Sequence, residues 1–263
     1  MIAVTRTLLL AALAATAIPS PASAMEAHST ARLLDGGRQG EVFRAGVEIT
    51  LDPGWKTYWR MPGESGVPPE FDWSKSANAA KAEVSYPAPH RFTDSGGEAI
   101  GYKERVVFPV VVTPADPEKP VDLTLTLHYA VCNDICIPAK AELSRVLGGG
   151  SAPAAETALV REAATLVPTE EGKGIEVRDA RLEGEGKESR LVVTLEGAQA
   201  EAGVDIFVEG FDDAYFRAPA AESEARFSLL IDGLKDRAAL AGRTLTLTIV
   251  TPGARLVRQV RVE

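Results

Sequence analysis

Apolar and polar residues alternate along most of the chain, which is the pattern of half-buried β-strands. Stretches rich in glycine, proline and aspartate separate these segments, and such residues favour turns. In the first half, the predicted strands cover residues 41–51, 105–113, 121–131 and 140–147, and the turn-rich stretches cover 52–55, 61–70, 93–97 and 114–120. We therefore predict that the first half is all β.

The pattern changes after residue 147. The segment GGGSAPA at 148–154 has the composition of a linker, whereas AAETALVREAATLVP at 154–168 is rich in alanine, leucine and glutamate and ends at Pro168. Such a segment predicts a helix that stops at the proline, because proline cannot continue one. We expect the linker and the helix together to occupy residues 149–172.

The alternating pattern returns in the last third of the chain, in short segments whose spacing is typical of a β-sandwich. These predicted strands cover residues 174–182, 189–195, 204–210, 214–219, 225–231, 243–251 and 255–263. The chain is therefore predicted to be all-β, with two sandwich domains at residues 25–148 and 173–263 joined by a short helix.

Residues 1–24 have the features of a secretory signal peptide. They carry one positive charge at Arg6, an apolar run at 8–18 and the small residues Ala22, Ser23 and Ala24 at the end. The apolar run is too short to span a membrane. We therefore expect cleavage after Ala24, export to the periplasm and no stable membrane insertion. In such an oxidising compartment two cysteines can pair and stay paired.

The formal net charge of −9 at pH 7 excludes two classes of partner from our expectations. Nucleic acid requires a basic surface, and binding to anionic lipid requires clusters of lysine and arginine. The sequence also lacks the common motifs of serine hydrolases, phosphate-binding loops and zinc proteases. The candidate chemistry therefore rests on the two cysteines.

Cys132 and Cys136 are the only cysteines, and both lie in YAVCNDICIPAK at 129–140. Four steps along an extended strand span about 13 Å, whereas the Cα atoms of bridged cysteines lie roughly 4.4–6.8 Å apart. A bridge therefore requires the chain to reverse between them. Asn133 and Asp134 favour that reversal because both residue types form turns, so we predict a hairpin with the cysteines on either side of its tip.

Three interpretations of this pair remain open. A five-residue loop would stabilise the fold by only about 2 kcal/mol, which favours a redox pair over a structural disulfide. A metal site is the third, because His128 completes H-x3-C-x3-C and soft thiolates suit Cu(I) or Zn(II); Cys132, Cys136 and His128 would then bind copper. No lysine or arginine lies within three residues of Cys136, so we predict no strongly acidic thiol there.

The aromatic residues are distributed unevenly between the two predicted domains. All three tryptophans lie in GWKTYWRMPGESGVPPEFDW, at positions 55, 59 and 73. Neighbouring residues of a strand face opposite sides. Because Trp59 follows Tyr58, we expect Trp59 to lie partly exposed near a site.

Four motifs in order give the first domain a family resemblance: GWKTYWRMPGESGVPPEFDW, YPAPHRF, GYKERVVFPVVVTPADP and LTLHYAVCNDICIPAKAEL. Together they resemble the N-terminal periplasmic domain of the thiol:disulfide interchange protein DsbD, in the ScsB branch linked to copper tolerance. The resemblance covers most of residues 30–147 and implies an immunoglobulin-like sandwich with a cysteine pair on a hairpin. The helix and second β region also resemble the second N-terminal module of that branch, so two immunoglobulin-like domains are expected.

The resemblance also implies a function. Domains of this family take electrons from a membrane-embedded thiol transporter by way of a thioredoxin-like domain, and they reduce oxidised periplasmic thiol proteins without a cofactor. An oxidoreductase of the protein-disulfide reductase type is therefore expected. By position, Cys136 would form mixed disulfides and Cys132 would resolve them.

Other site residues follow from the resemblance. Tyr58 falls where the family has an aromatic residue beside the cysteines, and the segment 91–102 falls where a cap loop shields them, with Asp94 as its acidic residue. Trp59, Tyr102 and His128 complete the expected lining of the site.

Three departures from the family pattern change the expectations. The cysteine spacing is shorter than the C-x5-C of the best-known member of the family. Small residues at 95–97 replace an aromatic shield in the cap loop. The sequence ends at Glu263 without membrane helices or a thioredoxin-like domain, so a separate protein is expected to supply the electrons.

Overall fold

The computed structural model describes residues 23–26, 28–63, 66–94, 97–171, 174–197, 203–211, 214–234, 236 and 239–263. Most of the predicted signal peptide lies outside this part of the chain. Only its last two residues, Ser23 and Ala24, are described, at the start of strand β1 (Ser23–Glu26). None of the described helices is long and apolar enough to cross a membrane.

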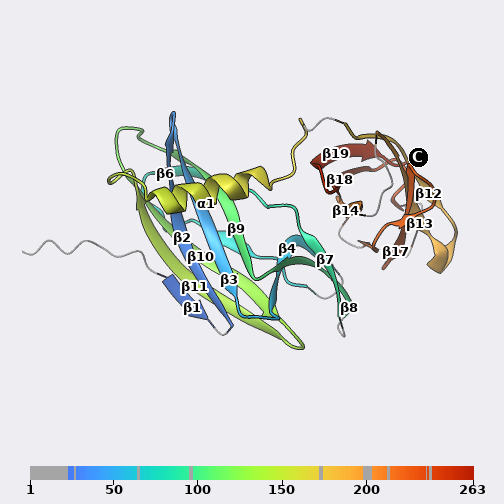
Figure 1. Cartoon of the computed structure of the whole chain (residues 1–263), viewed down its shortest axis with the longest axis horizontal. Helices are drawn as coiled ribbons and strands as arrows, with labels where there is room; N and C mark the ends of the chain where they lie inside the picture. Colours follow the sequence, from blue (N-terminus) through green and yellow to red (C-terminus); the bar gives the residue numbers. More distant parts are fainter. Residues whose placement is uncertain are drawn as a thin grey trace, which may run out of the picture.

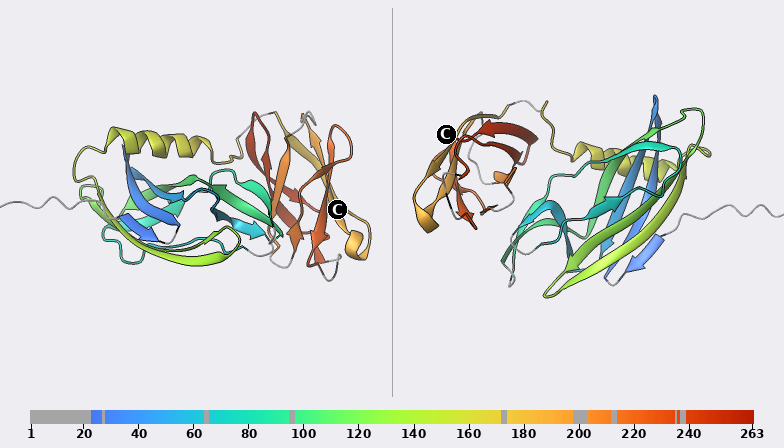
Figure 2. Two further views of the ribbon diagram at one scale, coloured as in Figure 1. Left: turned by 60° about the horizontal axis from the view of Figure 1, so that its bottom comes forward. Right: turned by 180° about the vertical axis from the view of Figure 1, so that it is seen from behind.

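The chain folds into two β-sandwiches that lie side by side, with one helix along the first of them (Figures 1 and 2). The predicted all-β architecture of two sandwiches is therefore confirmed. One sheet of the first sandwich has the strand order β1-β2-β3-β9-β6, and the other has the order β11-β10-β4-β8-β7, with β5 paired to β10.

The bounds of the first sheet's strands are β2 Ser29–Gln39, β3 Val42–Leu51, β6 Ala79–Val84 and β9 Arg105–Pro114. Those of the second sheet are β4 Lys56–Gly63, β5 Glu70–Asp72, β7 His90–Asp94, β8 Gly97–Lys103, β10 Val121–Cys132 and β11 Cys136–Leu147.

Between the two sheets lies an apolar core that the alternating pattern predicts well. Leu123, Leu125 and Leu127 of β10 are fully buried in it, whereas Asp122 and His128 face solvent. Burial of each leucine contributes about 1.5–3 kcal/mol relative to exposure.

Strands β1, β2 and β4 to β8 were not predicted. Strand β4 shows why, since four consecutive residues from Lys56 to Trp59 are buried. Trp59 packs into the core between the sheets, and Tyr58 packs on the opposite face in a second cluster. A strand covered on both faces loses the alternating pattern from which half-buried strands are recognised.

The predicted helix is present as α1 (Ala154–Thr165) and packs on the first sandwich. Its buried residues Val160 and Ala163 contact Leu34 of β2 and Val107 of β9. The fit is close, because a Cβ atom added at Gly46 would lie 3.0 Å from a methyl group of Val160. The helix therefore covers the first sheet in addition to connecting the two domains.

The second sandwich has two sheets, with the orders β12-β13-β17-β15 and β14-β18-β19, and β16 pairs with β17. Its own core includes the buried residues Leu191, Leu229 and Leu247. The elements are β12 Glu176–Glu183, the 3-10 helix η1 Gly186–Glu188, β13 Arg190–Glu196, β14 Asp205–Glu209, β15 Tyr215–Phe216, β16 Ala220–Ala221, β17 Arg226–Asp232, β18 Thr244–Val250 and β19 Arg255–Arg261.

The two domains share buried side chains. Phe207 of β14 is 1% exposed and belongs to the core cluster of the first domain, where its ring centre lies 5.7 Å from that of Trp59. Arg60 donates two hydrogen bonds to Glu209, from Nε to Oε2 over 2.6 Å and from Nη2 to Oε1 over 2.8 Å. The second domain therefore completes the core of the first.

Candidate functional site

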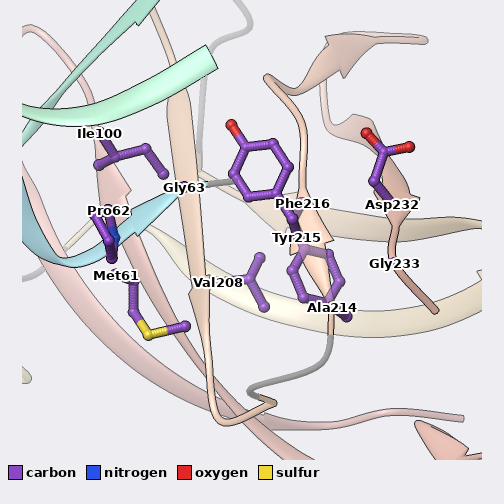
Figure 3. Close-up of a pocket in the computed structure, with 10 residues that line it drawn as sticks. All are labelled: Met61, Pro62, Gly63, Ile100, Val208, Ala214, Tyr215, Phe216, Asp232 and Gly233. Carbon is purple, nitrogen blue, oxygen red and sulfur yellow. The ribbon is translucent and has the colours of Figure 1, made fainter. Parts of the chain in front are cut away.

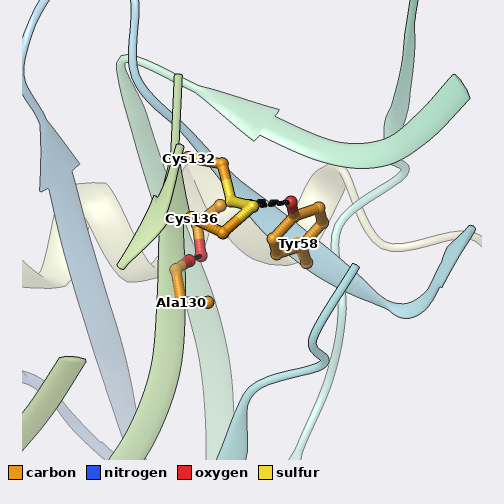
Figure 4. Close-up of a disulfide and its surroundings, with 5 residues drawn as sticks. Tyr58, Ala130, Cys132 and Cys136 are labelled. Atoms are coloured by element: carbon orange, nitrogen blue, oxygen red, sulfur yellow. Dashed lines mark hydrogen bonds between the residues drawn. A yellow bond between two sulfur atoms is a disulfide. The ribbon is translucent and has the colours of Figure 1, made fainter. Parts of the chain in front are cut away.

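The two cysteines close a long hairpin as a disulfide (Figure 4). Strands β10 and β11 pair along their full lengths, and the last pair in the register is Cys132 with Cys136. The Asn133 N–H donates to the Ile135 carbonyl over 3.1 Å across the tip, and the cysteine Cα atoms lie 4.2 Å apart. The predicted chain reversal between the cysteines is confirmed.

The two halves of this disulfide differ in exposure. Cys132 is 1% exposed and lies in a buried cluster with Tyr58, Ala99 and Ala130, whereas Cys136 is exposed at the tip. A protein partner can therefore reach the Cys136 side of the bond, while the Cys132 side faces the protein.

Tyr58 of β4 directs its hydroxyl at the bond. The oxygen lies 2.8 Å from Cys132 Sγ and 3.2 Å from Cys136 Sγ, and because the sulfurs of a disulfide carry no hydrogen, the hydroxyl is the donor. Burial raises the pKa of Tyr58 above its ordinary value. The hydroxyl therefore stays protonated at neutral pH, placed to stabilise negative charge on sulfur.

Lys56 lies directly opposite Cys132 in the pairing of β4 with β10. Residues opposite each other in a sheet project to the same face, and Lys56 is 6% exposed. Burial, and then the charge of Lys103, lower the pKa of Lys56. The sequence does not reveal this cation, because no local pattern marks a pairing between distant segments.

Two of the expected site residues lie on the other face of the sheet. Trp59 is 1% exposed in the core, so the expectation of partial exposure is wrong; Phe207 of the second domain covers it. Tyr102 is also buried in the core, and its hydroxyl donates to the Pro87 carbonyl over 2.8 Å. Strand alternation separates both residues from Tyr58.

The structure does not assemble the candidate metal site. His128 is exposed on β10, four residues before Cys132, and four strand steps span about 13 Å. Within the described part of the chain, no group of three or more histidine, cysteine, aspartate or glutamate residues is placed to hold a metal ion. With the cysteines joined as a disulfide, His128 therefore lies apart from them.

The segment expected to be a cap forms the hairpin of β7 and β8. Asp94 pairs with Gly97 at the end of this hairpin, but its side chain lies outside what the structure describes, as do Ser95 and Gly96. Ala99 of β8 joins the buried cluster around Tyr58 and Cys132. The β7–β8 hairpin therefore packs beside the buried half of the disulfide.

Comparisons with known proteins agree with this geometry. Residues 25–148 match the family of the N-terminal domain of the thiol:disulfide interchange protein DsbD, and residues 166–262 match a domain of unknown function. A search of curated protein sequences found no match.

Among solved structures, the chain is similar to the crystal structure of the N-terminal periplasmic domain of ScsB from Proteus mirabilis. The TM-score is 0.70 at 25% sequence identity, over 90% of this chain and 93% of that chain. The family match and the structural match are both consistent with a cysteine pair joined as a disulfide on the hairpin. Residues 25–148 therefore form a DsbD-like N-terminal domain, a thiol:disulfide interchange module.

Proposed function

We propose that this chain is an exported protein-disulfide reductase that relays electron pairs. It would receive them from a membrane-embedded thiol transporter or a thioredoxin-like protein, and pass them to oxidised periplasmic thiol proteins. The signal-peptide pattern of residues 1–24 and the similarity to a periplasmic domain of ScsB support the location.

The observation that carries this proposal is the asymmetry of the disulfide. Cys136 is exposed, whereas Cys132 is 1% exposed and accepts a hydrogen bond from Tyr58. Exchange requires one accessible sulfur for the attacking thiolate and a second sulfur that leaves as a stabilised thiolate. The two cysteines meet these two requirements separately.

Reduction of the domain begins when a donor thiolate attacks Cys136 Sγ. A bond forms between the donor sulfur and Cys136 Sγ, the bond to Cys132 Sγ breaks, and Cys132 leaves as a thiolate with the electron pair. The Tyr58 hydroxyl donates to that developing charge. The donor's second thiolate then attacks the donor sulfur that is bonded to Cys136 Sγ. This step releases the Cys136 thiolate and leaves the donor with an internal disulfide.

Transfer to a substrate follows the same path in reverse. The Cys136 thiolate attacks a substrate disulfide and forms a mixed disulfide, and one substrate sulfur leaves as a thiolate. Cys132 then attacks Cys136 Sγ, which restores the internal disulfide and releases the second substrate sulfur. Two electrons leave the domain, and the substrate sulfurs take up two protons from water.

Ile135 supports contact with a protein partner at this position. It is adjacent to Cys136 at the tip of the hairpin and is 65% exposed. An apolar side chain beside the reacting sulfur would be buried against a partner and would add to the affinity of the complex.

The proposal predicts that Cys132→Ala accumulates mixed disulfides through Cys136, because the resolving thiol is gone. The full chain would be mixed with a periplasmic extract treated with a thiol oxidant, and adducts would be counted on non-reducing gels and identified by mass spectrometry. Cys136→Ala is the matched control, since its remaining thiol is buried, and it should form few adducts.

Two results would contradict the relay. The first is an equal yield of adducts from Cys132→Ala and Cys136→Ala, or none from either. The second is a reduction potential of the unaltered disulfide below about −300 mV, which is typical of an inert structural bond.

Tyr58→Phe is expected to slow reduction of the disulfide by dithiothreitol about tenfold. A hydrogen bond to a charged group contributes roughly 1.5–3 kcal/mol, and about 1.4 kcal/mol corresponds to a factor of ten in rate. The second-order rate constant at pH 7 is the measurement. Tyr129→Phe is the control, because it removes a buried hydroxyl that bonds Ser29 on the core face of β10. A rate for Tyr58→Phe equal to that of Tyr129→Phe would contradict the role of Tyr58.

A further inference from the structure

The β7–β8 hairpin makes different contacts through its two faces. Arg91 pairs with Ile100, and the next pair is Phe92 with Ala99. Paired residues project to the same side and neighbours to opposite sides. Arg91 and Glu98 therefore share one face, and Ala99 lies on the other.

The first face binds the second domain through Arg91. This side chain is only 8% exposed. Its guanidinium donates to Asp205 Oδ1 from Nη2 over 3.1 Å, and to the carbonyls of Ile206 and Phe216 over 3.1 and 3.2 Å. It also lies 4.9 Å from the ring centre of Phe207. Three consecutive residues of β14, 205–207, and the carbonyl of Phe216 thus surround one side chain of the hairpin.

Glu98 holds the same face from the partner strand. It accepts a hydrogen bond from Arg91 Nη1 over 2.5 Å, one from the Tyr215 hydroxyl and one from the Ala218 N–H over 3.4 Å. Burial, and then the hydrogen bond to Glu98, raise the pKa of Tyr215 well above its ordinary value, so this hydroxyl remains a donor. We call Arg91, Glu98, Asp205 and Tyr215 the clamp.

A cavity lies next to the clamp. A cavity of about 390 Å³ lies between the domains, and its lining includes Gly63 and Ile100 from the first domain and Val208 and Tyr215 from the second (Figure 3). Beside this cavity, the polar bonds of Arg91 and Glu98 hold the hairpin to the second domain together with the apolar contact of Phe207.

The second face of the hairpin contacts the disulfide. Ala99, adjacent to Glu98, packs in the buried cluster with Tyr58 and Cys132. Two residues further along, Gly101 pairs with Tyr58 itself. The position of β8 therefore determines where the Tyr58 hydroxyl lies relative to Cys132 Sγ.

We propose that the second domain sets the reactivity of the disulfide through the clamp, which holds β8 against Tyr58 and keeps the Tyr58 hydroxyl on Cys132 Sγ. Arg91 and Glu98 are positioning residues that act through Ala99 and Tyr58. This role rests on the proposed exchange function of the cysteine pair, and it assigns a task to the domain at residues 166–262.

The test is the rate of reduction of the full chain by dithiothreitol, which supplies two electrons and is oxidised to its cyclic disulfide. Arg91→Gln is expected to slow this reduction about three- to tenfold. The double variant Tyr58→Phe/Arg91→Gln should be no slower than Tyr58→Phe alone, because the clamp acts through that hydroxyl. Arg226→Gln is the control, since Arg226 pairs with Glu183 and Glu222 of its own domain, and its rate should be unchanged.

The proposal is overturned if folded Arg91→Gln reacts at the rate of the unaltered chain, or if its effect multiplies with that of Tyr58→Phe. Where Arg91→Gln does not fold, Tyr215→Phe decides, because it removes one hydroxyl and should give a smaller slowing of the same sign; no slowing overturns the proposal. The reaction uses no protein partner. A failed trapping experiment would therefore remove the relay function, while this rate still tests the clamp.

Discussion

Phe207→Ala is expected to lower the free energy of unfolding of the first domain by about 3–5 kcal/mol, although Phe207 belongs to the second. Its ring is 1% exposed in the core cluster of the first domain, near Trp59 and beneath the guanidinium of Arg91. Removing it leaves a cavity and deletes both ring contacts. A loss of this size is a large part of the stability of an ordinary domain.

Urea denaturation followed by tryptophan fluorescence is the measurement. All three tryptophans lie at positions 55, 59 and 73, so the signal reports on the first domain alone. Leu230→Ala is the control, because Leu230 is 47% exposed on the second domain and a surface substitution changes stability by less than about 0.5 kcal/mol. A change below about 1 kcal/mol for Phe207→Ala would contradict the shared core.

The second large effect is expected for Gly101→Ala. A Cβ atom at this position would lie 2.0 Å from the Thr57 carbonyl oxygen and 2.8 Å from the Tyr58 Cα. Both are backbone atoms, which cannot rotate away as a side chain does. Strands β4 and β8 would have to separate, at a cost of about 3 kcal/mol, the upper part of the usual range for overpacking.

This substitution should also displace Tyr58 and slow the reduction of the disulfide. Gly150→Ala provides the control, because nothing lies within 4 Å of its added Cβ. Both variants would be compared in urea denaturation and in the reaction with dithiothreitol. Equal stability and equal rate for the two variants would show that β4 and β8 do not approach as closely as described.

The sequence predicts best the strands that are buried on one face and exposed on the other. The first half of strand β10 alternates between buried leucines and more exposed polar residues, so its pattern reveals it. The helix α1 is revealed by its composition of alanine, leucine and glutamate and by Pro168. Strands β4 and β8 have covers on both sides, and their patterns do not reveal them. The cover of β4 comes partly from Phe207, far away in sequence, which also explains why the expected exposure of Trp59 is wrong.

The candidate site divides in the same way. The turn residues Asn133 and Asp134 predict the hairpin that joins the cysteines, because turn formation is a local property. Tyr58 follows from the resemblance of its motif to a family. Lys56 and Glu98 carry no such signal, since their importance comes from pairing across the sheet and from contact with the second domain.

The packing of α1 and Phe207 shows that the first domain extends beyond the residues that match its family. The family matches end at residue 148 and resume at residue 166, so α1 belongs to neither match, yet it covers Leu34 and Val107. A fragment cut at residue 148 would expose these residues on one sheet and Trp59 elsewhere, and apolar patches of this kind promote association between copies. The unit that folds cooperatively therefore extends beyond residue 148, where the family match ends.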